Sequence, residues 1–548
     1  MKTNRVIKIF LASSEELEAD RYRFGNLIRK LDNIYEKRGI RIELFEWEDY
    51  DAAYNGMRKQ DEYNERVRAS DMFLALFHKK AGKFTIEEFN IARKAFDEQA
   101  SPKIYTYIKD LEAGESESRE LAEFKRLMLE ELGHYWCRYS NFDTMQLHFV
   151  LQLQMVEATT PIKVEVKESQ VKIGDSTIAD LNNVPFTSEN TTHKELKSRK
   201  EQLDREIGNA ESGGRRGFFG QRSRTTDEEL ANLRAERESV TEQIERQEKA
   251  LVDTAMSIAR MQGGECSSRM RTAAELFEKG ETGKAEAVLK EDDMEADATN
   301  AKLKFDTAAQ PTAELARNIE RCAGEYMLKA RIVISGIADE SRYLKAAKLM
   351  STAIDLVSGR LPEETLAEYL FDYAVLLTDA GQQTKALETW ERLSGIYERL
   401  YRKAPQKYAY GYAGVLNNMA VLYSNKGDFD HCLSKYLKAV DIYDRLDREE
   451  PGIYDDDIAR LKNNLGTLYT DRDEYNKALS EFNEAARIRF ELLAKDNDPD
   501  SRSALADIYC NMATALQFSD HPQEALRYIA QAHAILDELD KEFPRIYE

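Results

Sequence analysis

The C-terminal half of the chain repeats one pattern of residues, and this repetition constrains the fold more than any other feature. In the copy that starts at Gly466, related positions follow three, twelve, sixteen and nineteen residues later, at Tyr469, Ala478, Phe482 and Ala485. The other clear copies start at Ala374, Ala420 and Ala513, so the period is about 46 residues. A repeat of roughly 20 to 50 residues predicts a stack of similar units and not one compact core.

The small and large positions of this pattern resemble those of the tetratricopeptide (TPR) family. Helix-turn-helix units of this kind need small residues where two helices cross and large residues between neighbouring units. The resemblance covers residues 265–548 and implies an α-solenoid that presents a surface to a protein or peptide partner. The period exceeds the usual ~34 residues, so longer helices or longer turns are expected.

Asparagine recurs in the first predicted helix of successive repeats, at Asn417, Asn418, Asn463 and Asn464, and again at Asn511. In a TPR array these helices line a groove, where side-chain amides can hydrogen-bond an extended peptide. We therefore take the first four as candidate partner-binding residues. Under an alternative interpretation, the amides satisfy neighbouring backbone groups.

Residues 1–157 alternate short apolar runs with amphipathic stretches, which is typical of a parallel sheet covered by helices. The apolar runs predict five strands, at Val6–Ala12, Ile40–Trp47, Met72–Phe77, Lys103–Ile108 and Tyr135–Tyr139. Helices are expected at about 15–35, 59–70, 85–99, 118–132 and 143–157. This strict alternation predicts a doubly wound, flavodoxin-like α/β domain whose ligand binds beyond the carboxyl ends of the strands.

Two connecting regions separate the α/β domain from the repeats. Residues 158–190 alternate apolar and polar side chains around Gly174-Asp175, which predicts a β-hairpin connector. Residues 191–264 predict a helical hairpin with a coiled-coil seam, because apolar residues recur at steps of three and four. Its helices are expected to join at 213–224, a basic and aromatic tip with four glycines. The tip could dock onto nucleic acid, a membrane or another copy's acidic repeats, or it could be a solvated loop.

Charge and missing motifs disfavour several classes of function. With 79 Lys and Arg against 100 Asp and Glu, the net charge is -21, so nucleic acid is an unfavourable partner. Five distant cysteines have no metal-binding spacing, and no metal site is expected. No apolar run approaches the roughly 18 residues of a membrane span and no signal-peptide pattern is present, so a cytoplasmic protein is expected. P-loop, HExxH and GxSxG motifs are absent.

The segment Gly82–Ala92 follows a buried strand and opens a helix, which places it at the carboxyl edge of the predicted sheet. On that helix Glu88 shares one side with Ala92 and Ala95, at steps of four and seven. Two small residues beside a carboxylate leave room for a ligand or for a closely packed helix. Under the alternative interpretation, Glu87 and Glu88 are acids of the first turn that complement the helix dipole.

Four segments of this domain together resemble the bacterial TIR-like domains, whose superfamily includes nucleoside 2-deoxyribosyltransferases. These segments are Ile7–Ser14, Glu46–Glu48, Ser70–Phe77 and Thr85–Ala92. Members resemble one another in a glutamate four residues before a small residue, and here that pair is Glu88 with Ala92. The chain has Phe84-Thr85 near the place where TIR enzymes often carry a Trp-Cys dipeptide.

The resemblance implies cleavage of the N-glycosidic bond between nicotinamide and ribose in NAD, which is then a substrate, and no cofactor is expected. Glu88 is the implied catalytic residue, since a carboxylate opposes the positive charge that develops on the ribose. Ser13 and Ser14 would donate hydrogen bonds to phosphate or ribose, or they cap the following helix. Trp47 would stack on a flat ring or belong to the core. His78 would serve as a base or phosphate ligand, or it is a capped surface residue.

The order of an α/β domain, a spacer and a repeat array is similar to that of bacterial immune or stress-response proteins. In such proteins the repeats detect a partner and the TIR-like domain consumes NAD, and the family implies a homo-oligomer on activation. Two alternatives remain open. A TIR and TPR adaptor without enzymatic activity would only self-associate and recruit proteins. A nucleoside deoxyribosyltransferase-like enzyme would instead exchange the base of another nucleoside.

Overall fold

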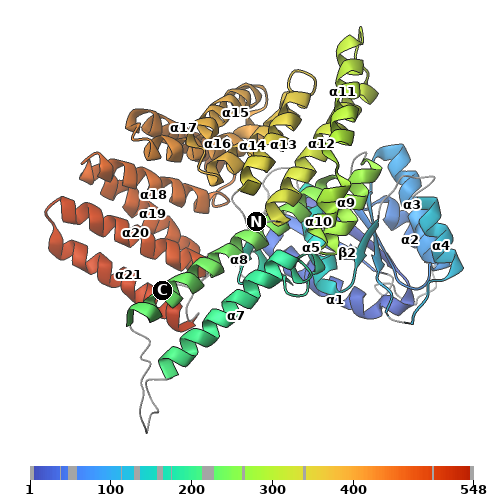
Figure 1. Cartoon of the computed structure of the whole chain (residues 1–548), viewed down its shortest axis with the longest axis horizontal. Helices are drawn as coiled ribbons and strands as arrows, with labels where there is room; N and C mark the ends of the chain where they lie inside the picture. Colours follow the sequence, from blue (N-terminus) through green and yellow to red (C-terminus); the bar gives the residue numbers. More distant parts are fainter. Residues whose placement is uncertain are drawn as a thin grey trace. The chain divides into compact units, whose positions relative to one another are not determined.

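The computed structural model describes residues 5–36, 39–46, 59–112, 114–128, 136–156, 164–173, 176–212, 227–261, 266–336, 341–495 and 499–542. The chain divides into two compact units, the first formed by 1–297 with 328–342 and the second by 298–327 with 343–548. Helices dominate both units, and the first also contains two small sheets (Figure 1).

The larger sheet has five parallel strands in the order β2-β1-β3-β4-β5, which is the order of flavodoxin-like doubly wound sheets. The strands are β1 Arg5–Ser13, β2 Ile40–Phe45, β3 Met72–Phe77, β4 Lys103–Lys109 and β5 Trp136–Tyr139. The five expected strands are therefore present. Strand β2 ends before the expected Trp47, which lies outside the described residues.

Helices cover both faces of this sheet (Figure 1). One face packs against α1 Glu18–Glu36 and α5 Phe142–Val156, and the other against α2 Lys59–Arg68, α3 Lys83–Gln99 and α4 Arg119–Arg126. Because both faces of the central strand β3 are covered, all six of its residues are buried. This is why the strand is a continuous apolar run in the sequence.

A second, three-stranded sheet and an antiparallel helical pair follow. The strands β6 Glu165–Lys167, β7 Gln170–Ile173 and β8 Ser176–Asp180 pair in the order β6-β7-β8, and then come α6 Pro185–Ser188, α7 Thr191–Ser212 and α8 Asp227–Met261. Helices α7 and α8 lie side by side (Figure 1) and bury Leu203, Val240 and Ile244. The basic tip 213–224 lies outside the described residues.

The rest of the chain is helical. Its helices are α9 Ser268–Glu278, α10 Thr282–Val288, α11 Glu291–Thr307, α12 Ala313–Gly336, α13 Ser341–Val357, α14 Glu363–Asp379, α15 Gln383–Lys403, α16 Pro405–Asn425, α17 Phe429–Glu449, α18 Asp455–Asp471, α19 Tyr475–Lys495, α20 Pro499–Phe518 and α21 Pro522–Glu542. From α14 onward they form hairpins of two helices, each helix 17 to 21 residues long. The expected TPR-like solenoid is confirmed, and its long helices account for the long period.

The small residues of the repeat lie where the two helices of a hairpin meet. A Cβ atom on Gly466 of α18 would lie 2.5 Å from the Phe482 ring of α19, so a larger residue there would force the ring or the helices to shift. Trp390, at the position that corresponds to Phe482, is fully buried. Ile529 occupies the same position in the last described hairpin and is 38% exposed.

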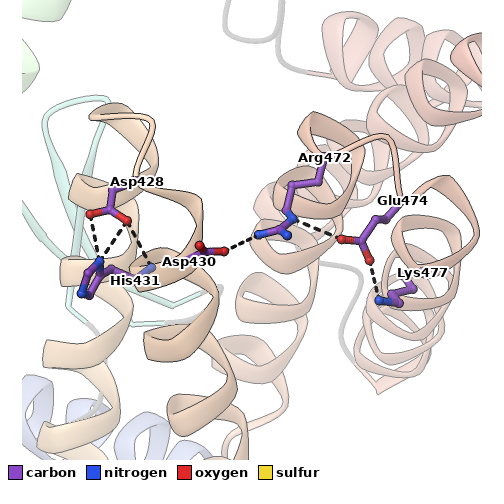
Figure 2. A network of polar contacts seen from close by, with 6 residues as sticks. All are labelled: Asp428, Asp430, His431, Arg472, Glu474 and Lys477. Carbon is purple, nitrogen blue, oxygen red and sulfur yellow. Dashed lines mark hydrogen bonds and ion pairs between the residues drawn. The ribbon is translucent and has the colours of Figure 1, made fainter.

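Successive repeats are also joined by charged side chains at their turns (Figure 2). Arg472, just after α18, donates to Asp430 of α17 at 2.9 Å and to Glu474 at 3.1 Å. Within the earlier turn, the Asp428 carboxylate accepts the backbone N–H of His431 at 3.3 Å and caps α17. The network therefore joins the α16–α17 turn to the α18–α19 turn.

Candidate functional site

The carboxyl edge of the five-stranded sheet holds a buried acid that joins three elements. Asp20, in the first turn of α1, is 4% exposed. It accepts hydrogen bonds from the Lys109 ammonium at 2.9 Å and from the Tyr139 hydroxyl at 3.0 Å. Burial, followed by the Asp20 charge, raises the pKa of Tyr139, so this hydroxyl stays protonated and donates. The first turn of α1 is thereby tied to the ends of β4 and β5.

A buried arginine organises the loop after β1. Arg21, 2% exposed, donates to the Ser13 hydroxyl at 2.8 Å and to the Ser14 carbonyl at 2.9 Å. The Ser14 hydroxyl donates to Glu16 at 3.3 Å. The two serines lie at the carboxyl end of β1, as the sequence indicates, and both side chains have partners within the chain.

His78 lies directly after β3, and its Nε2 atom is 3.2 Å from a carboxylate oxygen of Glu115. The neighbouring Lys79 pairs with the same carboxylate. This hydrogen bond from Lys79, followed by one from the backbone N–H of Glu112, lowers the pKa of Glu115. His78 is therefore part of a charged cluster at the sheet edge.

The backbone after β3 is also engaged. The N–H groups of Lys79 and Lys80 donate to the Glu16 carboxylate at 2.9 and 3.2 Å. Consecutive N–H groups of this kind form a cradle for anions. Here the anion that they hold is a side chain of the same domain.

Glu88 lies in the second turn of α3 and is 8% exposed. Ala92 and Ala95, on the same side of the helix, are buried as well. The alternative interpretation of Glu87 and Glu88 as first-turn acids is wrong, because α3 begins at Lys83 and its first turn has no acid. Glu87 instead accepts a hydrogen bond from Asn64 of α2 at 3.4 Å.

Sequence reasoning missed Asp20, Arg21, Lys109 and Tyr139. The sequence did contain a signal for these residues. Lys109 and Tyr139 are the last residues of their strands, and Asp20 and Arg21 follow β1 after one short turn. Parallel strands meet at their carboxyl ends, so polar residues at those positions share one edge of the sheet. The pairing among them depends on strand order, which no single segment reveals.

In the repeat array, the candidate asparagines contact one another. The side chain of Asn464 donates to Asn417 at 3.4 Å, and Asn511 donates to Asn463 at 3.1 Å. These four amides and Asn418 are half-buried. Each amide has two donor hydrogens and an acceptor oxygen, so one bond to a neighbour leaves capacity for a partner.

Neither a metal centre nor a membrane span emerges from the described part of the chain. No group of three or more His, Cys, Asp and Glu side chains there could hold a metal ion. Among the same residues, no helix has the length and apolar character to cross a bilayer. The five cysteines are free thiols.

Comparisons with known proteins give distant structural likenesses. No family model and no curated protein matches the chain. RapI in its apo form is 16% identical over 63% of this chain and 77% of its own, with a TM-score of 0.37. BtubC from P. vanneervenii is 20% identical over 46% and 94%, with a TM-score of 0.34. A signal transduction ATPase with a TPR sensor from Pyrococcus horikoshii is 12% identical over 99% and 96%, with a TM-score of 0.21. These low scores assign no activity.

Proposed function

We propose that the α/β domain cleaves the N-glycosidic bond of NAD and that the repeat array controls this reaction by binding a protein or peptide. The observation that carries the enzymatic part is the position of Glu88. The residue is 8% exposed on the helix that follows the central strand, beside the small residues Ala92 and Ala95. A carboxylate held largely out of water opposes the charge of an oxocarbenium-like ribose more strongly than a solvated one.

Two cationic groups at the same sheet edge support a nucleotide substrate. Arg21 and Lys109 are held by Ser13 and Asp20, so their positions are defined before any ligand binds. In doubly wound sheets, the phosphates of a nucleotide lie beyond the carboxyl ends of the strands. The preorganised Arg21 guanidinium favours a diphosphate, whereas the Lys109 ammonium is already paired with Asp20.

The regulatory part of the proposal rests on the amide row of the repeats. Half-buried asparagines on successive first helices offer hydrogen-bonding groups at the spacing of the repeat. An extended peptide can satisfy such a row. Binding there would promote a homo-oligomer in which a neighbouring copy completes the NAD site.

The test is NAD consumption by the purified full chain, alone and after enforced clustering through an epitope tag and a bivalent antibody. We expect clustered wild type to consume NAD and Glu88→Gln to be slower by about a hundredfold, the effect of removing one preorganised electrostatic group. Glu87→Gln is the matched control, because this half-buried neighbour contacts α2 through Asn64. Equal rates for wild type and Glu88→Gln, or an inert clustered wild type, would refute the enzymatic proposal.

A second candidate function is an adaptor without enzymatic activity. It is favoured by the engagement of Ser13, His78 and the N–H groups of Lys79 and Lys80 with partners in the same domain. An adaptor would self-associate, as seen by sedimentation, without loss of NAD. Base exchange between added deoxynucleosides would indicate a deoxyribosyltransferase-like enzyme instead.

A further inference from the structure

The first unit contains a cavity at the ends of β4 and β5 that is distinct from Glu88. Its volume is about 270 Å³, close to the lower limit of about 300 Å³ for pockets that bind small molecules. Helices α5, α6, α8 and α9 complete its walls. Because it extends from β5 to α9, we call it the β5–α9 cavity.

The walls of the β5–α9 cavity are largely apolar. They include Leu147, Leu151, Phe186, Ala255 and Ile258. Phe186 is held in place by its stack on Phe277, with ring centroids 5.5 Å apart. An apolar ligand body would gain from burial against these side chains.

One carboxylate on the cavity wall lacks a partner. Asp110 accepts a hydrogen bond from Arg138 at 2.8 Å, and Glu189 accepts one from Lys194 at 2.6 Å. In contrast, no hydrogen bond or ion pair with another described residue reaches Glu278. Burial, with repulsion from Glu275 next, raises the pKa of Glu278 to about 8.

The charges around Glu278 favour a cation. Among the described residues that line the cavity, four are acids and two are basic, namely Asp110, Glu189, Glu275 and Glu278 against Arg138 and Lys279. Arg138 and Lys279 attract Glu278 without forming an ion pair with it, so a cationic ligand would supply a direct partner and relieve the repulsion between Glu275 and Glu278. An anionic ligand would add to the excess of negative charge.

We propose that the β5–α9 cavity binds a small organic cation with an apolar body, whose charge lies against Glu278. The aromatic ring of Phe186 suits a quaternary ammonium group, because such cations are attracted to aromatic faces. The site does not depend on Glu88 or on NAD cleavage. The cation would be a second ligand of the first unit. Its site lies beside β5, which is the edge strand opposite to β2.

Binding of the cation should depend on pH. Glu278 must lose its proton to pair with the cation, so affinity rises as the pH increases toward 8 and is constant above it. At pH values well below 8, the affinity for the cation rises about tenfold per pH unit. The other titratable and charged groups that line the cavity with Glu278 are Glu275 on α9, Lys279 just after α9, and Asp110, Cys137, Arg138, His148 and Glu189 from other elements. Burial, followed by the Glu278 charge, raises the pKa of Cys137, so this thiol stays neutral.

The test is calorimetric titration of the full chain with choline and with 3,3-dimethylbutan-1-ol, which has a carbon in place of the cationic nitrogen. Choline has a fixed charge, so only the protein titrates. We expect choline to bind and the neutral analogue to bind at least tenfold more weakly. Failure of choline to bind at pH 9, or equal affinity for the two compounds, would overturn the proposal.

Variants locate the site. Glu278→Gln should weaken choline binding at least tenfold, and Ala255→Phe should abolish it by filling the cavity. Glu281→Gln is the matched control, because this acid follows Glu278 by three residues, pairs with Lys284 and is not among the residues that line the cavity. Binding that survives both cavity variants would refute the assignment. If a variant fails to fold, the pH dependence and the analogue pair on wild type still decide.

Discussion

The sheet edge of the first unit and the turns of the repeats both carry charged networks, but the two differ in burial and in sequence separation. Asp20 is 4% exposed, and its partners Lys109 and Tyr139 lie 89 and 119 residues further along the chain. The side chain of Asp430 is 92% exposed and pairs with Arg472, which lies 42 residues away. Buried charges must be paired, whereas exposed pairs contribute little to stability. The first network therefore holds its elements in one arrangement, and the second only supports contacts made by the helices.

The strongest way to break the buried network is Asp20→Ala. Lys109 and Tyr139 lose their common acceptor, and we expect a loss of about 3 kcal/mol in the stability of the sheet edge. Hydrogen exchange of the peptides that contain β4 and β5 measures this locally. Asp430→Ala is the matched control in the repeats. It should change the free energy of local opening there, measured by hydrogen exchange, by less than about 1 kcal/mol. Similar effects for the two substitutions would remove the distinction between the networks.

Packing of the repeats depends on small residues more than on charges, and Gly466→Ala tests this. The new Cβ would lie 2.5 to 2.9 Å from three atoms of the Phe482 ring, so the helices must move apart. We expect the free energy of unfolding, measured by urea denaturation, to fall by about 2 kcal/mol. Gly414→Ala is the control, since nothing lies within 4 Å of its added Cβ. It should stabilise α16 by about 0.5–1 kcal/mol, because alanine favours a helix. A Gly466→Ala protein as stable as wild type would show that the crossing tolerates a larger residue.

Glu278 of the first unit should also make stability depend on pH. The pKa of Glu278 is about 8 in the folded chain and 4.5 as its ordinary value, so the folded state holds the extra proton between these values. Wild type therefore loses stability relative to Glu278→Gln as the pH rises from 4.5 to 8, and the difference is constant above 8. Melting temperatures of the two proteins across this range measure the effect. A difference that does not change with pH would contradict it.

The smallest effect is expected for Arg472→Ala in the repeat turns. It removes the pairs with Asp430 and Glu474, both at the surface of the array (Figure 2). We expect the free energy of unfolding to fall by at most about 1 kcal/mol. The decrease should be smaller at high salt, because salt screens exposed ion pairs. Denaturation midpoints at low and high salt give the measurement. A larger loss that salt does not reduce would mean that the network has a structural role like that of Asp20.

The strands and the repeats could be predicted because each depends on the spacing of apolar or small residues along the chain. The run Met72–Phe77 is continuous and apolar, and the small residues from Ala374 to Ala513 recur at a constant spacing. The position of Glu88 on α3 followed in the same way. The first residue of α3 was not predicted correctly. The helix was expected from residue 85 but begins at Lys83, so Glu87 and Glu88 lie beyond its first turn. The catalytic role of Glu88 stays a prediction.

By itself, the sequence determined the order of the elements, the parallel α/β domain and the period of the solenoid. These follow from which residues along one segment are apolar, and burial of one face is a local property. Only the tertiary structure decided that Asp20 meets Lys109 and Tyr139 and that Glu278 of α9 faces a cavity at the end of β5. Such contacts depend on which strands are neighbours and which helix closes over them, and that choice is made by the packing of the whole unit.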